Sequence, residues 1–499
     1  MAIKHWRLFY KMSKYLVINP NDDVAIALRE LKKGEVLDGI RLLQNIPQAH
    51  KFALHDMEKG HAVIKYGHVI GTLTHNVKKG EWIHTHNLRT TLDEEREYSF
   101  EKANKESLKA SERTFQGFKR LDGRVGIRND IYIIPLVGCI NNICMMIKRK
   151  FVKEHPDFND RVKVLTHPYG CSQLGDDKSN TRDTLIGLAK NPNAGGVLIV
   201  SLGCEENRLD TFIKHFGNYD QSRFYSFICQ ESKDEIAQGI ELMNKLFDVV
   251  SKDKRTTCHL SDLVLGLKCG GSDGFSGITA NPLVGTISDT IGASKGKVLL
   301  SEVPEMFGAE QQLMNRAKDK IVFKKVVNLI DNFKAYYVKN NQPCYENPSP
   351  GNKAGGISTL EEKSLGCVLK AGRLEVRDVL NPGEISESDG LSLVNGPGND
   401  IVASTNIASC GANLLLFTTG RGTPFSSVIP TVKIATNHIL ATAKKRWIDY
   451  DAERVFDLGW EKAHEELLDY IIDVCSGQLT AAEKLGDGEI GIFKSGVTL

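Results

Sequence analysis

Hydrophobic and polar positions along the chain fall into two patterns, and the first covers residues 14–91. There, short apolar segments alternate with polar turns that contain lysine and glycine, such as KKGE and EKGH. Short apolar segments bounded by such turns are typical of β-strands. The strand-like segments are YLVINP, HKFALHD, AVIKYGHVIGTL and WIHTHN. The pattern therefore predicts a small all-β domain over residues 14–91.

The second pattern begins after a charged segment. Residues 92–114 contain few large apolar side chains, which indicates a linker. Beyond them, apolar β-branched segments alternate with helical ones, as in a parallel sheet covered by helices. A charged stretch at 251–262 divides this part of the chain. We predict one α/β domain over 115–257 and a catalytic α/β domain over 258–499, both with mainly parallel sheets.

Composition and charge argue against several classes of function. The net charge of the 499 residues is +2 with histidine neutral, so no strong field attracts nucleic acid or an anionic membrane. No apolar stretch reaches the roughly 18 residues of a membrane span, and the N-terminus lacks the features of a signal peptide. The 11 cysteines are scattered, which indicates reduced thiols in a cytoplasmic protein. We expect a small soluble substrate and no nucleic-acid or membrane partner.

Histidines are concentrated in the predicted β domain. It contains half of the 14 histidines, namely His50, His55, His61, His68, His75, His84 and His86. His84 and His86 are two residues apart, and side chains two apart on a strand share one face. Imidazoles on one face can bind the same metal ion. With His50, which precedes Lys51 in an apolar segment, they are candidate metal ligands.

Cysteine and glycine follow several of the predicted strands. The four loops are Gly138-Cys139, Gly170-Cys171, Gly203-Cys204 and Cys269-Gly270-Gly271-Ser272-Asp273. In open α/β sheets, ligands bind beyond the carboxyl ends of the strands, so these loops could converge on one crevice. Thiolates favour soft metals such as iron and zinc. The chain has no CxxC pair, which argues against a zinc ribbon.

Two loops in the last third of the chain could bind a small anion. Residues 347–353 read NPSPGNK, and residues 418–424 read TTGRGTP after a strand-like segment. Glycine allows close approach of the backbone, and arginine can bind a carboxylate through two parallel hydrogen bonds. Neither loop matches a nucleotide-binding fingerprint. The loops therefore favour a small carboxylate as the ligand.

Longer strings carry a resemblance to a known family. They are AHKFAL, VIKYGHVIG, YGCSQLGDD, SLGCEEN, LKCGGSDGFSGITANP, SEVPEMFGAE, NPSPGNKAGGISTLEEKSLG and TTGRGTPFSSVIPTVKIATN. From about residue 15 to the C-terminus, the chain resembles the altronate/galactarate dehydratase family, and residues 14–91 resemble its SAF (β-clip) domain. The strings are closer to the altronate type. The resemblance implies an iron(II)-dependent hydro-lyase of hexuronate catabolism that converts D-altronate to 2-dehydro-3-deoxy-D-gluconate; galactarate or another hydroxy acid is the alternative substrate.

Sequence alone leaves the form of the metal centre and the oligomeric state open. One placement is a single iron ion with ligands among His50, His84, His86, Cys171 and Cys204. The other is an iron–sulfur cluster on Cys171, Cys204 and Cys269, because cysteine thiolates bind such clusters. We favour the single ion, since the histidines have no role in the cluster. Candidates for proton transfer are Lys51, His167, Glu302, Glu305 and Lys433, and candidates for substrate binding are Ser272, Asp273, Asn352, Lys353 and Arg421. A homo-oligomer is possible.

Overall fold

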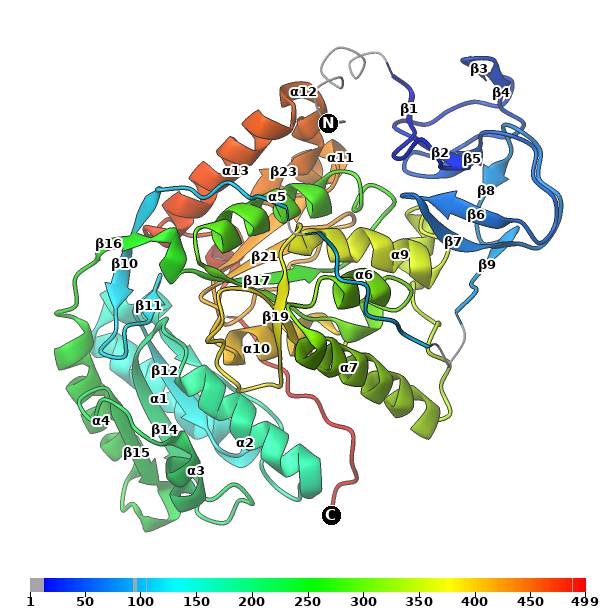
Figure 1. Ribbon diagram of the computed structural model, residues 1–499. Coiled ribbons are helices and arrows are strands. Elements are labelled where there is room, and N and C mark those ends of the chain that lie inside the picture. Colours follow the sequence, from blue (N-terminus) through cyan, green and yellow to red (C-terminus); the bar gives the residue numbers. More distant parts are fainter. Residues whose placement is uncertain (1–12, 93–96, 105, 487) are drawn as a thin grey trace.

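The computed structural model describes residues 13–92, 97–104, 106–486 and 488–499. Figure 1 shows a small β domain at one end of the molecule, an α/β domain at the other end, and a larger α/β domain between them. Both α/β domains contain a parallel sheet. This arrangement confirms the predicted fold class. Within the described residues, no helix is both long enough and apolar enough to cross a membrane.

The N-terminal domain consists of short antiparallel strands joined by tight turns. Its larger sheet has the order β1 (Tyr15–Leu16), β2 (Val24–Ala27), β5 (Lys51–Ala53), β8 (Trp82–Ile83). The smaller sheets are β3 (Val36–Leu37) with β4 (Ile40–Arg41), and β6 (Ala62–Lys65) with β7 (His68–Leu73) and β9 (Leu88–Arg89). In the predicted lysine–glycine turns, Gly34, Gly60 and Gly80 have φ of 82°, 88° and 84°, a left-handed conformation that glycine adopts without strain.

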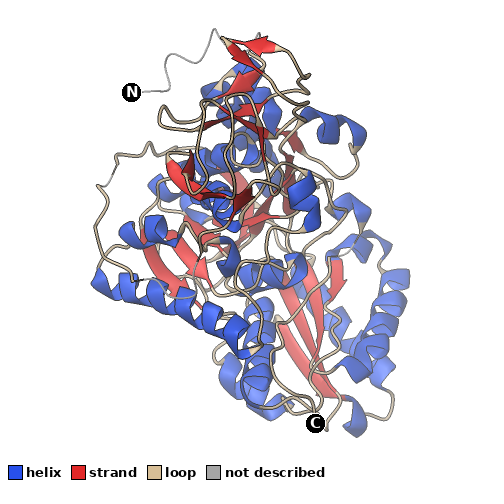
Figure 2. Ribbon diagram, turned by 90° about the vertical axis from the view of Figure 1, so that its right-hand side faces the viewer, coloured by secondary structure: helices blue, strands red, loops and turns tan. Residues whose placement is uncertain are grey.

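The second domain has a four-stranded parallel sheet with helices on both faces (Figure 2). The strand order is β13 (Val162–Val164), β12 (Asp130–Pro135), β14 (Ala194–Ser201), β15 (Phe224–Ile228). Helices α1 (Asn141–Glu154) and α4 (Glu235–Val250) cover one face, and α2 (Gly175–Ala189) and α3 (Leu209–Phe216) cover the other. The chain leaves β12 toward β13 on one side and returns to β14 on the other, so the strand order reverses between β12 and β14.

The C-terminal domain is built on a seven-stranded parallel sheet. Its order is β19 (Val376–Leu380), β20 (Gly390–Val394), β18 (Lys297–Leu300), β17 (Val264–Cys269), β21 (Leu414–Thr419), β22 (Thr431–Ala435), β23 (Tyr450–Asp451). Its helices are α5 (Ala280–Ala293), α6 (Glu310–Asn315), α7 (Lys320–Lys339), α8 (Pro350–Ala354), α9 (Leu360–Cys367), α10 (Asp400–Ser409), α11 (His438–Ala443), α12 (Val455–Leu458) and α13 (Trp460–Cys475). The strand order reverses between β17 and β21, and open α/β sheets bind ligands outside the carboxyl ends of strands at such a point.

The two α/β domains are closely joined. A small antiparallel sheet of β10 (Thr114–Lys119), β11 (Val125–Gly126) and β16 (Thr256–His259) connects them. Helix α2 packs against α10, and one apolar core continues from the second domain into the C-terminal domain. The predicted linker has neither helix nor strand before Thr114 in its described part. The three predicted boundaries between these segments stay predictions.

Candidate active site

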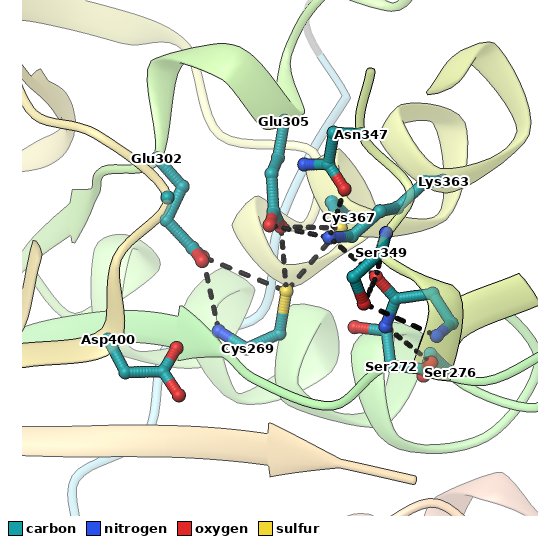
Figure 3. A network of polar contacts seen from close by, with 12 residues as sticks. Cys269, Ser272, Ser276, Glu302, Glu305, Asn347, Ser349, Lys363, Cys367 and Asp400 are labelled. Atoms are coloured by element: carbon teal, nitrogen blue, oxygen red, sulfur yellow. Dashed lines mark hydrogen bonds and ion pairs between the residues drawn. The ribbon is translucent and has the colours of Figure 1, made fainter. Parts of the chain in front are cut away.

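Two thiols and a carboxylate meet at the point where the order of the large sheet reverses (Figure 3). Cys269 ends β17, Glu305 ends the 3-10 turn Val303–Glu305 after β18, and Cys367 ends α9. The Oε2 atom of Glu305 lies 3.1 Å from Cys269 Sγ and 3.2 Å from Cys367 Sγ, and the two Sγ atoms are 3.4 Å apart. All three side chains are buried. Their ligand atoms lie within 4.8 Å of one another, close enough to hold one metal ion.

Three buried lysines surround this group. Lys370 Nζ donates to Cys269 Sγ at 2.9 Å, and Lys363 Nζ donates to Glu305 Oε1 at 2.7 Å. Lys268, inside strand β17, donates to Glu302 and lies 2.9 Å from a carboxylate oxygen of Asp400. Buried charges require partners of opposite sign, so the lysines and acids form one mutually dependent network.

The pKa values of the two glutamates in this network are shifted in opposite directions. Burial opposes ionisation of Glu305, but Lys363, Lys268 and Lys370 outweigh it and hold the pKa of Glu305 well below its ordinary value. Burial, followed by repulsion from Glu305, raises the pKa of Glu302. One ionised carboxylate thus lies beside a carboxyl group that binds a proton more readily. A pair of acids separated in this way is typical of acid–base catalysis.

The backbone after β18 places both glutamates in the network. Glu302 has φ of 71°, a left-handed conformation that is uncommon for a residue with a β-carbon. The 3-10 turn begins at the next residue, Val303, contains Pro304 and ends at Glu305. The Oε2 atom of Glu302 accepts a hydrogen bond from the backbone N–H of Cys269 at 3.1 Å. Backbone strain of this kind is common at functional sites, where the surrounding packing maintains it.

A row of polar side chains leads away from the thiols. Lys363 Nζ also donates to Asn347 Oδ1 at 3.0 Å and lies 3.3 Å from Asn352 Oδ1. Asn352 Nδ2 donates to the Ser272 carbonyl at 2.8 Å. The Ser272 hydroxyl is buried and has no hydrogen-bond partner among the described residues. An unpartnered buried hydroxyl requires an explanation, and a substrate hydroxyl or carboxylate would satisfy it.

The remaining predicted substrate residues differ in their surroundings. Asp273 is buried and accepts hydrogen bonds from Thr436 and Asn437, so it ties two loops together. Burial raises the pKa of its carboxyl group. Arg421 is exposed beside Gly351, and Lys353 is half-buried on α8. These two cations remain available to an anion entering from solvent.

Comparisons with known proteins agree with this architecture. Residues 260–498 match the family described as D-galactarate/Altronate dehydratase, C-terminal. Residues 117–251 match the second domain of D-galactarate dehydratase/Altronate hydrolase, and residues 13–91 match the altronate/galactarate dehydratase SAF domain. The chain is 47% identical to an altronate dehydratase of Bacillus subtilis over 98% of this chain and all of that protein. The chain belongs to the altronate/galactarate dehydratase family. An altronate dehydratase of Escherichia coli is 46% identical over 97% of this chain and all of that protein, and its galactarate dehydratase (L-threo-forming) is 32% identical over 93% of both chains.

The family's SAF domain brings His50, Lys51 and His84 against α8 and α9. His50 Nδ1 accepts a hydrogen bond from Trp82 Nε1 at 3.3 Å, and its Nε2 faces the Ala354 carbonyl at 3.4 Å. His84 Nδ1 lies 3.1 Å from Ser358 Oγ. The two imidazole rings are 5.0 Å apart between centroids. Both ring nitrogens of His50 thus have polar neighbours in this structure, one within the SAF domain and one on α8.

The expectation that His84 and His86 share one face of a strand is wrong. Strand β8 ends at Ile83, and His84–Asn87 form a turn. Asn87 stabilises this turn because its Oδ1 accepts from the His84 N–H at 2.9 Å and its Nδ2 donates to the Trp82 carbonyl at 2.8 Å. His84 is consequently buried, whereas His86 is exposed.

Lys51 belongs to a buried ion network between the SAF and C-terminal domains. Its Nζ donates to Glu362 Oε2 at 2.8 Å, and Lys65 Nζ donates to Glu362 Oε1 at 2.6 Å. Burial, opposed by Glu362, lowers the pKa of Lys51 to about 8, while the two lysines overcome burial and lower the pKa of Glu362 to about 2. Lys363, the next residue of α9, contacts Glu305. Helix α9 therefore connects docking of the SAF domain to the thiol site.

The predicted ligands do not converge on one site. Cys171 and Cys204 belong to the second domain, and Figure 1 shows this domain at the opposite end of the molecule from the SAF domain. The single-ion set is therefore divided between domains that the C-terminal domain separates. The alternative cluster set is divided as well, because Cys269 is buried in the C-terminal domain whereas Cys171 and Cys204 are exposed. The sequence pattern could not reveal this division, because each cysteine follows a similar apolar strand whichever domain it belongs to.

Besides Lys51, two predicted proton carriers lie outside the thiol group. His167 is buried in the second domain, where its Nε2 contacts the Pro135 carbonyl at 2.8 Å. Burial lowers its pKa, which favours a neutral structural imidazole. Lys433 lies on β22, two strands from β17, and its Nζ donates to the Thr423 carbonyl at 2.7 Å. Burial lowers the pKa of Lys433 to about 8.

The sequence interpretation missed five members of the network. They are Lys268, Lys363, Cys367, Lys370 and Asp400. One signal was present, because Lys268 interrupts the otherwise apolar strand LVLGLKC. A second signal was the spacing of Lys363 and Cys367, which are four residues apart and so share one face of a helix.

Proposed function

We propose that this protein is a hydro-lyase that removes water from D-altronate and yields 2-dehydro-3-deoxy-D-gluconate. The buried group of Cys269, Cys367 and Glu305, enclosed by lysines, is the observation that carries the proposal. It suits a substrate whose reaction builds negative charge beside a carboxylate. The altronate dehydratase of Bacillus subtilis, 47% identical over 98% of this chain, supports the choice of substrate.

The reaction is a β-elimination that needs charge stabilisation. Removing the proton from C2 places a second negative charge on the carboxylate end of the substrate. Buried cations stabilise such charge strongly because no water competes with them. The ammonium groups of Lys363 and Lys370 lie within the network and remain charged. Burial opposes their charge, but Glu305 beside Lys363 and the Cys269 sulfur beside Lys370 outweigh it and raise their pKa values. We assign them to the substrate carboxylate.

Glu302 is our candidate for proton transfer. Its raised pKa makes its carboxylate a better base than that of Glu305. As a base it accepts the C2 proton, the C3–O bond breaks, and the same proton can leave with the hydroxide as water. The resulting enol then takes a proton at C3 and becomes the 2-keto acid. Groups that transfer protons in this way typically contribute about 10²–10⁴-fold to the rate.

Iron(II) is the cofactor that we propose for the group of Cys269, Glu305 and Cys367. Two sulfur atoms and one carboxylate oxygen form a mixed donor set that suits a borderline metal such as iron(II) or zinc. When bound, the metal would act as a Lewis acid toward oxygen atoms of the substrate. The hydrogen bond with the neighbouring Cys269 thiol, followed by burial, raises the pKa of Cys367, so binding the metal must displace a proton.

Substrate hydroxyl groups would contact the polar row beside the lysines. The hydroxyl of Ser272, which has no partner among the described residues, and the amide of Asn352 are buried, and both can form hydrogen bonds with the hydroxyl groups of a sugar acid. Arg421 and Lys353, at the outer end of this row, are candidates to attract the carboxylate from solvent. The cytoplasmic location and a homo-oligomeric state stay predictions from the sequence.

A substrate panel tests the proposal directly. Protein reconstituted anaerobically with ferrous iron should convert D-altronate to a 2-keto-3-deoxy acid, detected as its semicarbazone. Galactarate is the matched comparison, because a galactarate dehydratase is 32% identical over 93% of both chains. Product from galactarate but not from altronate would contradict the substrate and leave the reaction class intact. Absence of product from both acids would contradict the reaction class.

A further inference from the structure

The carboxyl edge of the second domain's sheet carries a cysteine after every strand. Cys139 follows β12, Cys171 follows β13, Cys204 follows β14 and Cys229 follows β15. Among the 11 cysteines of the chain, Cys139, Cys171 and Cys204 are the exposed ones. Free cysteine is usually a buried residue. Three exposed thiols on one edge of a sheet therefore require an explanation, and the elimination reaction does not use them.

Backbone hydrogen bonds bring the three loops together. The N–H of Gly138 donates to the Tyr169 carbonyl at 2.8 Å, and the N–H of Glu206 donates to the Gly170 carbonyl at 3.1 Å. The loop after β13 thus lies between the loops after β12 and β14. Cys139, Cys171 and Cys204 are each within two residues of one of these bonds. The three exposed cysteines consequently lie on adjoining loops at one edge of the sheet.

Glycine is required for this close approach. A β-carbon on Gly170, whose φ is 98°, would lie 2.2 Å from the Leu136 carbonyl oxygen, and one on Gly138 would lie 2.8 Å from the His167 carbonyl oxygen. The glycine before each of these two cysteines therefore lets the loops touch. The chain end adds a further contact, because the N–H of Leu499 donates to the Ser172 carbonyl at 3.1 Å.

The region coincides with the point where the strand order of this sheet reverses. Sheets with this order bind ligands outside the carboxyl ends of the two strands that flank the reversal, here β12 and β14. Cys139 and Cys204 follow those two strands. Cys229 differs, because it packs against the core formed by α1 and α4, and burial raises its pKa to about 11.

We propose that Cys139, Cys171 and Cys204 form a thiolate site for a soft metal centre, separate from the buried group at Cys269. Three thiolates can bind a single zinc-like ion, with a fourth ligand from outside the trio. They can also bind an iron–sulfur cluster in which one iron has no cysteine ligand. Loops at the reversal point supply the thiols, and their exposure gives the metal a path of entry.

The test compares full-length wild type with the triple variant C139S/C171S/C204S. In one arm, metal-free protein is titrated with cobalt(II), and thiolate-to-cobalt charge-transfer absorption is recorded. In the other arm, protein is reconstituted anaerobically with iron and sulfide, and iron, acid-labile sulfide and visible absorption are measured. We expect the triple variant to lose about one metal centre and its absorption in one of the two arms. The arm that responds identifies a single ion or a cluster.

Two controls separate this site from the buried group and from misfolding. C229S alters the cysteine at the same edge that faces the core, and it should keep the full signal. C269S/C367S should also keep the signal of the exposed site, whatever happens to altronate turnover. Circular dichroism checks folding of the triple variant. Equal metal content and equal spectra for wild type and folded triple variant in both arms would overturn the proposal, irrespective of the fate of the hydro-lyase assignment.

Discussion

The two parallel sheets of this protein present cysteines at equivalent places in very different surroundings. In each sheet, a strand beside the reversal of strand order leads to a cysteine next to glycine: Cys269 is the last residue of β17, and Cys139 follows β12. Helix α9 and the SAF domain cover the first edge, whereas the second edge is open to solvent. This difference in burial changes the chemistry of the cysteines. Buried charges need partners of opposite charge, so the acids, thiols and lysines of the first edge form one network of paired groups.

The largest expected difference between the two edges is the effect of a glutamate-to-glutamine substitution on kcat. We expect E302Q to lower kcat by about 10²–10⁴-fold, because the amide accepts no proton from C2. KM for altronate should change little, since Lys363 and Ser272 remain. Steady-state kinetics with equal iron loading measures both constants. The matched variant is E205Q at the second edge, where buried Glu205 accepts hydrogen bonds from Ser201 Oγ at 2.5 Å and from the Gly203 N–H at 2.7 Å.

Turnover of E205Q should stay within a few-fold of wild type, because that carboxylate maintains a loop remote from the buried thiols. Similar losses of kcat in E302Q and E205Q would erase the functional distinction between the two edges. Near-normal kcat in E302Q would remove Glu302 from proton transfer.

Coverage by the SAF domain should depend on Glu362. E362Q leaves Lys51 and Lys65 buried without a counter-charge, and breaking a buried pair in this way typically lowers the free energy of unfolding by about 3–5 kcal/mol. K51M should cost clearly less, because Lys65 still neutralises Glu362. Chemical denaturation measures the order of these effects.

The neighbouring E361Q is the control for the Glu362 series. Glu361 is also buried on α9, but its carboxylate accepts from the hydroxyl and backbone groups of Thr90 and Thr91, which carry no charge. Replacing Glu361 leaves no buried cation without a partner. E361Q should therefore lower the free energy of unfolding by about 1–3 kcal/mol. A larger loss in E361Q than in E362Q would mean that charge compensation does not stabilise this interface.

The sequence predicted local features well and long-range compensation poorly. Short apolar segments and Lys-Gly turns predicted a small all-β domain, and the alternation of apolar β-branched segments with helical ones predicted the parallel sheets. Glu302, Ser272 and Asn352 were also singled out, since they follow strands or lie in glycine-rich loops. Cys367 and Lys370 were missed because they lie at the end of α9 and in the 3-10 turn after it, about a hundred residues from Cys269 in sequence. Asn87 turned the HTH segment out of its strand through side-chain hydrogen bonds that a period-two pattern does not register.

Acid should lower the free energy of unfolding through the buried histidines of the SAF domain. Burial lowers the pKa of His50 to about 4 and that of His84 to about 3, from an ordinary value of 6.5. Between pH 6.5 and about 4 the unfolded chain binds more protons, so the free energy of unfolding falls as pH falls through this window. H50Q and H84Q should each flatten the decline of the thermal midpoint between about pH 7.5 and 5. Exposed His68 is the control, and an equal flattening in H68Q would contradict this origin.

The difference in solvent access between the two edges should also appear in the reactivity of their cysteine thiols, and the serine variants that test it should disturb the fold little. A serine in place of an exposed cysteine removes little packing, so C139S, C171S and C204S should each change the free energy of unfolding by less than about 0.5 kcal/mol. In chelator-treated native protein, each variant should remove one of the thiols that react rapidly with a disulfide reagent, because reaction requires solvent access. C269S should leave the number of fast thiols unchanged, since its thiol lies beneath α9 beside Lys370. A rapid reaction of Cys269 in the native protein would show that the first edge opens to solvent, and the difference in chemistry between the two edges would then need another cause than coverage.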